Sequence, residues 1–183
     1  LTTDECRRWL SQRRSNVHVK VNQISLNDLI GWTTDPSSGD IAHHTGGFFS
    51  IGGVRARTNF GPIDQWEQPI IYQPEVGILG IITKQINGIL YFLVQAKIEP
   101  GNINYVQLSP TVQATKSNYT RLHQGKLPEY LEYFLNPSKH QILVDHLQSE
   151  QGGRFFQKRN RNVIIEVTDE IILTENFCWL TLG

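Results

Sequence analysis

Two long apolar stretches in the middle of the chain are separated by a single Asn-Gly pair. Residues 76–84 are mostly apolar, and residues 89–98 continue the pattern shortly after Asn87 and Gly88. Both residues of this pair tolerate positive φ, which the tight turn of a two-residue β-hairpin requires. The pattern therefore predicts a β-hairpin over residues 76–98.

Shorter alternating segments predict further strands. Apolar and polar positions alternate as they do in strands with one buried face, or form short extended runs, at residues 17–21, 48–51, 54–58, 69–72, 105–108, 112–115, 141–147 and 162–167. Residues 33–47 are rich in Thr, Ser, Gly and Asp, which is typical of a loop.

Four segments have features of helices. Thr2 and Glu5 have the spacing of a capping box, which predicts a helix to about residue 11. Residues 25–30 and 127–135 also suit short helices, and residues 149–159 are compatible with one, although two consecutive glycines disfavour it. Strands and helices together predict an α+β fold, with a largely antiparallel sheet flanked by helices.

Composition and charge exclude several classes of protein. Hydrophobic residues make up 39% and charged residues 19%, which fits a folded chain rather than a disordered one. Seventeen Lys and Arg balance seventeen Asp and Glu, so no overall basic field favours nucleic acid or an anionic membrane. No apolar run reaches about 18 residues, and the N-terminus lacks the apolar core of a secretory signal. We therefore expect a cytoplasmic protein without a membrane or nucleic-acid partner.

The residue counts also bear on the extent of the protein. The sequence contains no Met, which predicts that it is a piece of a longer protein. Its length suits a single domain over residues 1–183. The two cysteines, Cys6 and Cys178, are too few and too far apart in sequence for a disulfide framework or a metal motif, so we expect reduced thiols.

Polar residues gather at the end of the second hairpin strand. Gln95, Lys97 and Glu99 share one face of that strand, which is apolar earlier on. Thr111, Gln113 and Thr115 would form a second polar row. The two rows line either a cleft or a strand end that meets solvent, and the pattern alone leaves both open.

Other segments carry groups suited to a nucleotide sugar. Residues 116–121 combine hydroxyl, amide, aromatic and cationic side chains, which suit phosphate, sugar and base, although a solvated loop has the same composition. Arg55 and Arg57 lie about 6.5 Å apart along one strand face, a spacing that suits either a diphosphate or solvent. Trp66, followed by Gln68, is either a stacking wall or a core residue.

The adjacent histidines and the basic residues around Lys158 do not indicate a metal site or a nucleic-acid site. Adjacent His43 and His44 should point to opposite sides of an extended chain, and neither a His-Glu-x-x-His spacing nor paired cysteines occur, so we expect no metal. One of these histidines remains a candidate ligand contact or acid/base group. The basic residues around Lys158 are interpreted as a solvated helix face.

Six ungapped segments resemble the NDP-hexose 2,3-dehydratases of deoxysugar biosynthesis. These segments are residues 43–58, 66–81, 95–102, 107–126, 147–162 and 177–183. The resemblance implies a fold similar to the Nudix hydrolases, with two such domains in a duplicated chain that forms homodimers. Residues 1–183 would be one repeat, corresponding to the first. The implied substrate is a dTDP-linked 4-keto-6-deoxyhexose, which loses its C2 hydroxyl to give a 3,4-diketo-2,6-dideoxy sugar.

The resemblance also implies the chemistry of the site. The glutamate-rich helix that binds metal in Nudix enzymes is missing, so an acid/base elimination without metal or cofactor is expected. The candidate catalytic residues are Glu99, Lys97, Glu75, Tyr119 and His44. The candidate substrate-binding residues are Arg55, Arg57, Trp66, Gln68, Gln95, Gln107, Ser109, Thr111, Gln113, Thr115, Ser117, Asn118 and Arg121. The alternatives are a repeat that binds a nucleotide sugar without catalysis and a Nudix-type phosphohydrolase.

Overall fold

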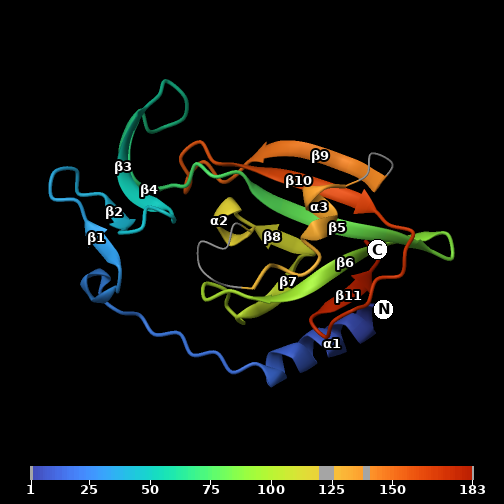
Figure 1. Cartoon of the computed structure of the whole chain (residues 1–183). Helices are drawn as coiled ribbons and strands as arrows, with labels where there is room; N and C mark the ends of the chain where they lie inside the picture. The colour runs from blue at the N-terminus through green and yellow to red at the C-terminus, as the bar shows by residue number, and fades with distance from the viewer. Residues whose placement is uncertain (1, 120–125, 138–140, 183) are drawn as a thin grey trace.

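A computed structural model describes residues 2–119, 126–137 and 141–182. Its strands form two sheets, which Figure 1 shows side by side. The small sheet has the order β1-β2-β3-β4, built from Trp32–Thr34, Ile41–His43, Ser50–Arg57 and Gln65–Tyr72. All of its pairings are antiparallel.

The large sheet contains the predicted hairpin. Its main order is β11-β6-β5-β10-β9, built from Phe177–Leu180, Ile89–Ile98, Gly77–Ile86, Arg159–Glu166 and Ile142–Ser149. Only β10 and β5 pair in parallel among the described strands. The α+β class and the prevalence of antiparallel pairing are therefore confirmed, although the first four strands form a sheet of their own.

The β5–β6 hairpin turns at the predicted pair. Asn87 and Gly88 have φ of 52° and 78°, and Ile86 pairs with Ile89. Beyond the pairing of Ile82 with Leu93 the two strands diverge. Two short strands fill the gap: β7 (Val106–Pro110) pairs with β6, and β8 (Val112–Ala114) pairs with β5. The large sheet is thus split at one end.

The hydrophobic core covers one face of the large sheet. Helix α3 (Glu132–Leu135) places Phe134 against Gly80 of β5, and Phe134 is fully buried. The other core residues come from β5, β6, β8, β10, β11 and the chain before and after them: Ile78, Ile82, Leu93, Val112, Ala114, Leu131, Val163, Ile165, Val167, Ile171 and Phe177. This core holds the divergent ends of β5 and β6 at a fixed separation.

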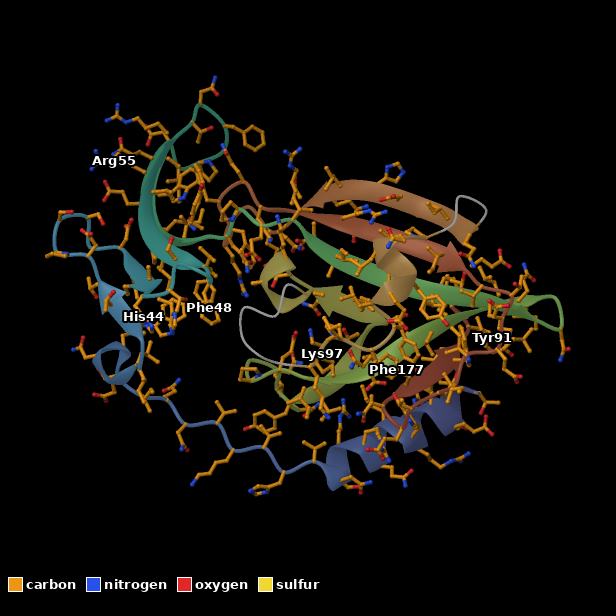
Figure 2. All side chains as sticks on the ribbon, in the orientation of Figure 1. His44, Phe48, Arg55, Tyr91, Lys97 and Phe177 are labelled. Atoms are coloured by element: carbon orange, nitrogen blue, oxygen red, sulfur yellow. The ribbon has the colours of Figure 1, made fainter. Side chains whose placement is uncertain are left out.

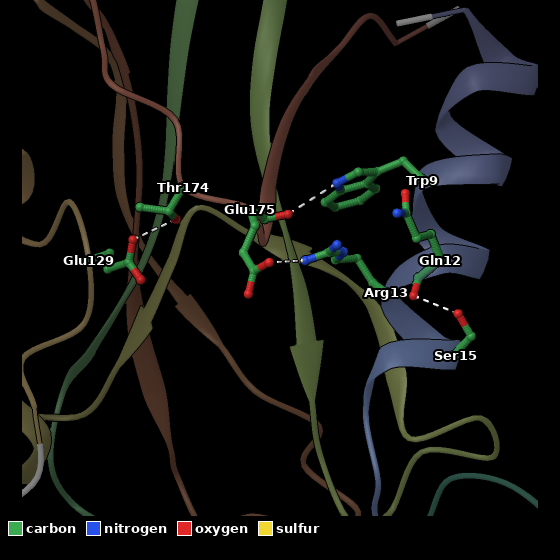
Figure 3. A network of polar contacts seen from close by, with 7 residues as sticks. All are labelled: Trp9, Gln12, Arg13, Ser15, Glu129, Thr174 and Glu175. Atoms are coloured by element: carbon green, nitrogen blue, oxygen red, sulfur yellow. Dashed lines mark hydrogen bonds and ion pairs between the residues drawn. The ribbon is translucent and has the colours of Figure 1, made fainter.

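The N-terminal helix α1 (Thr3–Asn16) packs beside β11 and β7. Its capping box at Thr2 and Glu5 forms as predicted, and the helix runs past the predicted end. Trp9 donates to the main-chain oxygen of Glu175 at 3.2 Å, and Arg13 pairs with the carboxylate of Glu175 at 2.7 Å (Figure 3). Among the described helices, none is long and apolar enough to cross a membrane.

Three of the predicted elements differ in the structure. Residues 17–21 form no strand, because none of the strands in the described part of the chain pairs with them. In the segment 127–135 only α3 is α-helical, since Tyr130 has a φ of 62°. The proposed helix over residues 149–159 is wrong: the segment turns at its glycines and bonds to β4, with Ile71 N donating to the Arg154 oxygen at 2.8 Å.

Strands β1, β2 and β11 were not predicted. The first two lie within residues 33–47 or at their border, where a polar composition indicated a loop. Two short helical segments complete the description: η1, a 3-10 helix at Leu26–Asp28, and α2 at Lys116–Tyr119.

Candidate functional site

A cleft of about 460 Å³ lies where the large sheet splits. Its walls come from the starts of β5 and β10, the end of β6, and β8. The lining residues are Gln73, Gly77, Ile78, Leu79, Lys97, Pro110, Gln113, Ala114, Thr115, Glu150, Phe155, Lys158 and Asn160. The space is large enough for part of a nucleotide sugar, and its walls combine cationic, amide and hydroxyl groups.

Lys97 joins the two polar rows that the sequence indicated. Its Nζ lies 2.8 Å from Oε1 of Gln113 on β8 and 3.1 Å from Oε1 of Glu99. The Lys97 side chain is 26% exposed, so its charge is partly desolvated while Glu99 partly balances it. The divergence of β5 and β6 therefore brings Lys97, Gln113 and Thr115 to one cleft.

Glu75 and Ser117 fix the segment after β8. The Ser117 main-chain N–H and hydroxyl both donate to Oε2 of Glu75, at 3.2 and 3.1 Å. The hydroxyls of Thr115 and Ser117 lie 2.8 Å apart. Ser117 is buried, so these bonds hold the start of α2 against the cleft wall.

Thr111 is buried between two strands and does not line the cleft. It is 1% exposed, and its hydroxyl accepts from the Ile82 N–H at 3.0 Å and donates to the Leu93 oxygen. It thus connects β5 and β6 at the point where they diverge. Its alternation with Gln113 suggested a shared polar face, but the segment enters the core before β8 begins.

Three other predicted binding residues lie near the cleft but do not line it. Gln107 and Ser109 line an adjoining hollow of about 130 Å³ together with Lys97 and Glu99. Gln95 lines a separate hollow of about 380 Å³ between β6 and α1, which also includes Lys97. Lys97 therefore stands at the junction of the three hollows.

The predicted residues of the small sheet lie away from Lys97. Figure 2 shows Arg55 on β3 and His44 just after β2, both separated from Lys97 on β6. Arg55 Nε bonds to Glu67 at 2.6 Å, and Arg57 Nε bonds to Gln65 at 3.1 Å. None of these side chains lines the cleft between the sheet ends.

Trp66 and Gln68 connect the small sheet to the large one. Trp66 Nε1 donates to Oε1 of Gln68 at 3.0 Å, and Gln68 Nε2 donates to the Gly153 oxygen at 2.7 Å. Gly153 belongs to the turn that leads to the cleft residues Phe155 and Lys158. Gln68 therefore supports the cleft wall from outside.

The predicted separation of the two histidines is wrong. The rings of His43 and His44 pack with their centroids 4.4 Å apart, because β2 ends at His43 and the chain turns at once. His44 Nδ1 lies 3.0 Å from the Gly31 oxygen. Over the described ranges, no three His, Cys, Asp or Glu side chains gather in a way that would hold a metal ion.

Sequence patterns missed the wall formed by residues 150–160. Lys158 is 5% exposed, and burial lowers its pKa, an effect that the carboxylates of Glu75 and Glu150 oppose. Asn160 accepts from the Gly77 N–H at 2.9 Å and donates to Glu150 at 2.5 Å. The interpretation of Lys158 as part of a solvated helix face is therefore wrong, since it is neither solvated nor helical.

The remaining predicted residues follow β8. Asn118 and Tyr119 are the last two residues of α2. Arg121 lies outside the described residues.

Fold and cleft together define an α+β protein with a polar, ligand-sized site at the split end of a mixed sheet. A profile of the NDP-hexose 2,3-dehydratases matches residues 3–183, and the chain belongs to this family.

Two relatives carry the name dTDP-4-dehydro-6-deoxy-alpha-D-glucopyranose 2,3-dehydratase. The protein from Saccharopolyspora spinosa is 49% identical over 183 residues, which cover this whole chain and 38% of the relative. The protein from Amycolatopsis orientalis is 47% identical over 188 residues, which cover this whole chain and 40% of the relative. The chain thus spans about two-fifths of the length of these relatives.

Proposed function

We propose that this chain is one repeat of a dTDP-4-keto-6-deoxyglucose 2,3-dehydratase, a hydro-lyase. The identity of 49% over the whole chain to a relative of that name carries the proposal. The coverage of 38% supports a second repeat of similar size in the longer protein. The Nudix-like fold of each repeat, a homodimer and a cytoplasmic location stay predictions from the sequence.

The reaction needs three groups from the protein. The C4 ketone acidifies the C3 proton, so a base removes that proton and an enolate forms. The C2 hydroxyl then leaves as water, and the 2,3-enol becomes a ketone. A base at C3, a donor to the C4 oxygen and a proton for the leaving hydroxyl are therefore required.

Lys97 and Glu99 suit the first two roles. Their side chains lie 3.1 Å apart at the end of β6, and Lys97 lines the cleft. We assign Glu99 as the base and Lys97 as the cation that stabilises the enolate oxygen. Gln113 and Thr115 would hold sugar hydroxyls from the opposite wall. Glu75, Tyr119 and His44 remain candidates, and Glu75 acts in this proposal by holding Ser117.

Two substitutions in the full-length protein test the assignment. Glu99→Gln and Lys97→Met should each lower the rate of diketo sugar formation about 100-fold or more, the usual scale for acid/base and oxyanion groups. Glu132→Gln and Lys84→Met, which change the same residue types away from Lys97 and Glu99, should leave the rate unchanged. Wild-type turnover in both Glu99→Gln and Lys97→Met would refute the assignment.

A binding repeat without catalysis is the second candidate. The observation that favours it is the coverage of about two-fifths, because the catalytic cleft can then belong to the other part of the protein. In that case Lys97→Met would abolish dTDP binding at one site, measured by calorimetric titration, while turnover persisted. Loss of turnover together with retained dTDP binding would favour the catalytic assignment.

A further inference from the structure

Lys158 is a buried cation in the wall of the cleft. It is the one charged residue among the buried residues of the described part of the chain, at 5% exposed. Its Nζ donates to the main-chain oxygen of Glu75, just before β5. Because this bond ties the Lys158 amine to the segment before β5, the amine has a fixed position in the cleft wall.

The surroundings of Lys158 are ordered by hydrogen bonds. Asn160, two residues further on, accepts from the Gly77 N–H at 2.9 Å and donates to Glu150 at 2.5 Å. Lys158, Asn160 and Glu150 all line the cleft. Preorganised groups of this kind are the ones that act on a reacting substrate without having to rearrange.

The electrostatic balance at Lys158 favours release of a proton. Burial lowers the pKa of Lys158, because the ammonium loses hydration, while Glu75 and Glu150 raise it to a smaller extent. A lysine with a lowered pKa gives up its proton more readily near neutral pH. The geometry of Lys97 is different: its side chain is 26% exposed, and its amine bonds to Glu99 and Gln113.

Resting on the function proposed above, we propose that Lys158 donates the proton to the C2 hydroxyl as that group leaves. Glu99 takes the C3 proton, and the C3–H electrons form the enolate C3=C4 bond. The enolate then restores the C4 ketone and forms C2=C3, the C2–O bond breaks, and the Lys158 ammonium protonates the departing oxygen to give water. The enol proton at O3 returns to Lys158, and Glu99 delivers its proton to C2.

Lys158→Met should distinguish loss of the C2 hydroxyl from removal of the C3 proton. In the full-length enzyme, Lys158→Met should lower dehydration about 100-fold or more. Exchange of the C3 hydrogen with solvent deuterium, followed by NMR, should persist, because Glu99 is still present. A substrate with fluorine in place of the C2 hydroxyl should be processed at close to the wild-type rate, because fluoride leaves without a proton.

Two further variants make the test decisive. Lys158→Arg keeps a positive charge but cannot give up its proton, so it should not restore dehydration. Lys84→Met removes a lysine whose amine bonds to the Asp169 oxygen at 2.9 Å outside the cleft, and it should behave like wild type. Affinity for dTDP and the melting temperature of each variant report whether the cleft is intact.

Several results would overturn the inference. Rescue by Lys158→Arg would assign a fixed charge instead of a proton donor, and loss of C3 exchange or of dTDP binding in Lys158→Met would assign positioning or folding. Full dehydration in Lys158→Met would remove the residue from the mechanism. Absence of diketo product from the wild-type protein would instead refute the proposed function itself.

Discussion

The phenyl ring of Phe134 occupies the space that a side chain on Gly80 would need. A Cβ atom at Gly80 would come within 2.5 Å of Cε1 of Phe134, and the ring is fully buried. Gly80 is therefore required by the close approach of α3 to β5.

We predict that Gly80→Ala destabilises the chain. The added methyl group must displace Phe134 from a packed core, which costs about 1–3 kcal/mol in the free energy of unfolding. Urea unfolding followed by circular dichroism measures the change. Gly53→Ala on β3 is the matched control, because nothing lies within 4 Å of its added Cβ. Equal stability of the two variants would contradict the packing argument.

A second prediction concerns the hydroxyl of Thr111. Thr111→Val keeps the shape of the side chain but leaves the Ile82 N–H and the Leu93 oxygen without this partner in a buried site. An unsatisfied buried polar group costs about 1–3 kcal/mol, so we expect a loss of at least that size in urea unfolding. Thr111→Ser keeps the hydroxyl and should recover much of the loss.

The sequence patterns correctly predicted the elements that are determined by residues close together in the chain. The Asn87–Gly88 turn and the Thr2 capping box depend on neighbouring residues, and both form as expected. The alternation of polar residues correctly grouped Lys97 with Gln113, since that pattern describes strands directly.

Other features depend on contacts between distant parts of the chain. Lys158 is buried because β10 pairs in parallel with β5, so that Asn160 lies beside Gly77. No local pattern encodes that pairing, and a basic segment beside aromatic residues also fits a solvated surface. Thr111 was assigned to the wrong environment for a similar reason, because alternation gives two faces but does not say where the strand enters the core.

The ion pair between Asp145 and Arg161 predicts a pH dependence of stability. Two hydrogen bonds from Arg161, at 2.8 and 2.6 Å, hold the pKa of Asp145 below its ordinary value. Since the folded pKa is the lower one, the stabilisation is present above the unfolded pKa of about 4 and is lost as pH falls through the folded pKa.

Asp145→Asn should therefore cost little at neutral pH and nothing in strong acid. Both side chains are about one-third exposed, so the expected loss at pH 7 is at most about 1 kcal/mol. Urea unfolding of both proteins from pH 7 downward measures the difference. A difference that grows in acid would have the wrong sign.

The last prediction concerns the reactivity of the two thiols. Burial, with a smaller contribution from the nearby Cys6, raises the pKa of Cys178 to about 12. Since the thiolate is the reactive form, the raised pKa keeps folded Cys178 protonated and therefore unreactive at pH 8. Cys6 on α1 is only half-buried.

A disulfide reagent such as 5,5′-dithiobis(2-nitrobenzoate) should therefore label Cys6 first and Cys178 only after unfolding in urea. In Cys6→Ser, labelling of the folded protein should disappear, because Cys178 stays beneath α1 within β11. Rapid labelling of folded Cys6→Ser would show that α1 opens away from β11 in solution, in spite of the contacts that Trp9 and Arg13 make with Glu175.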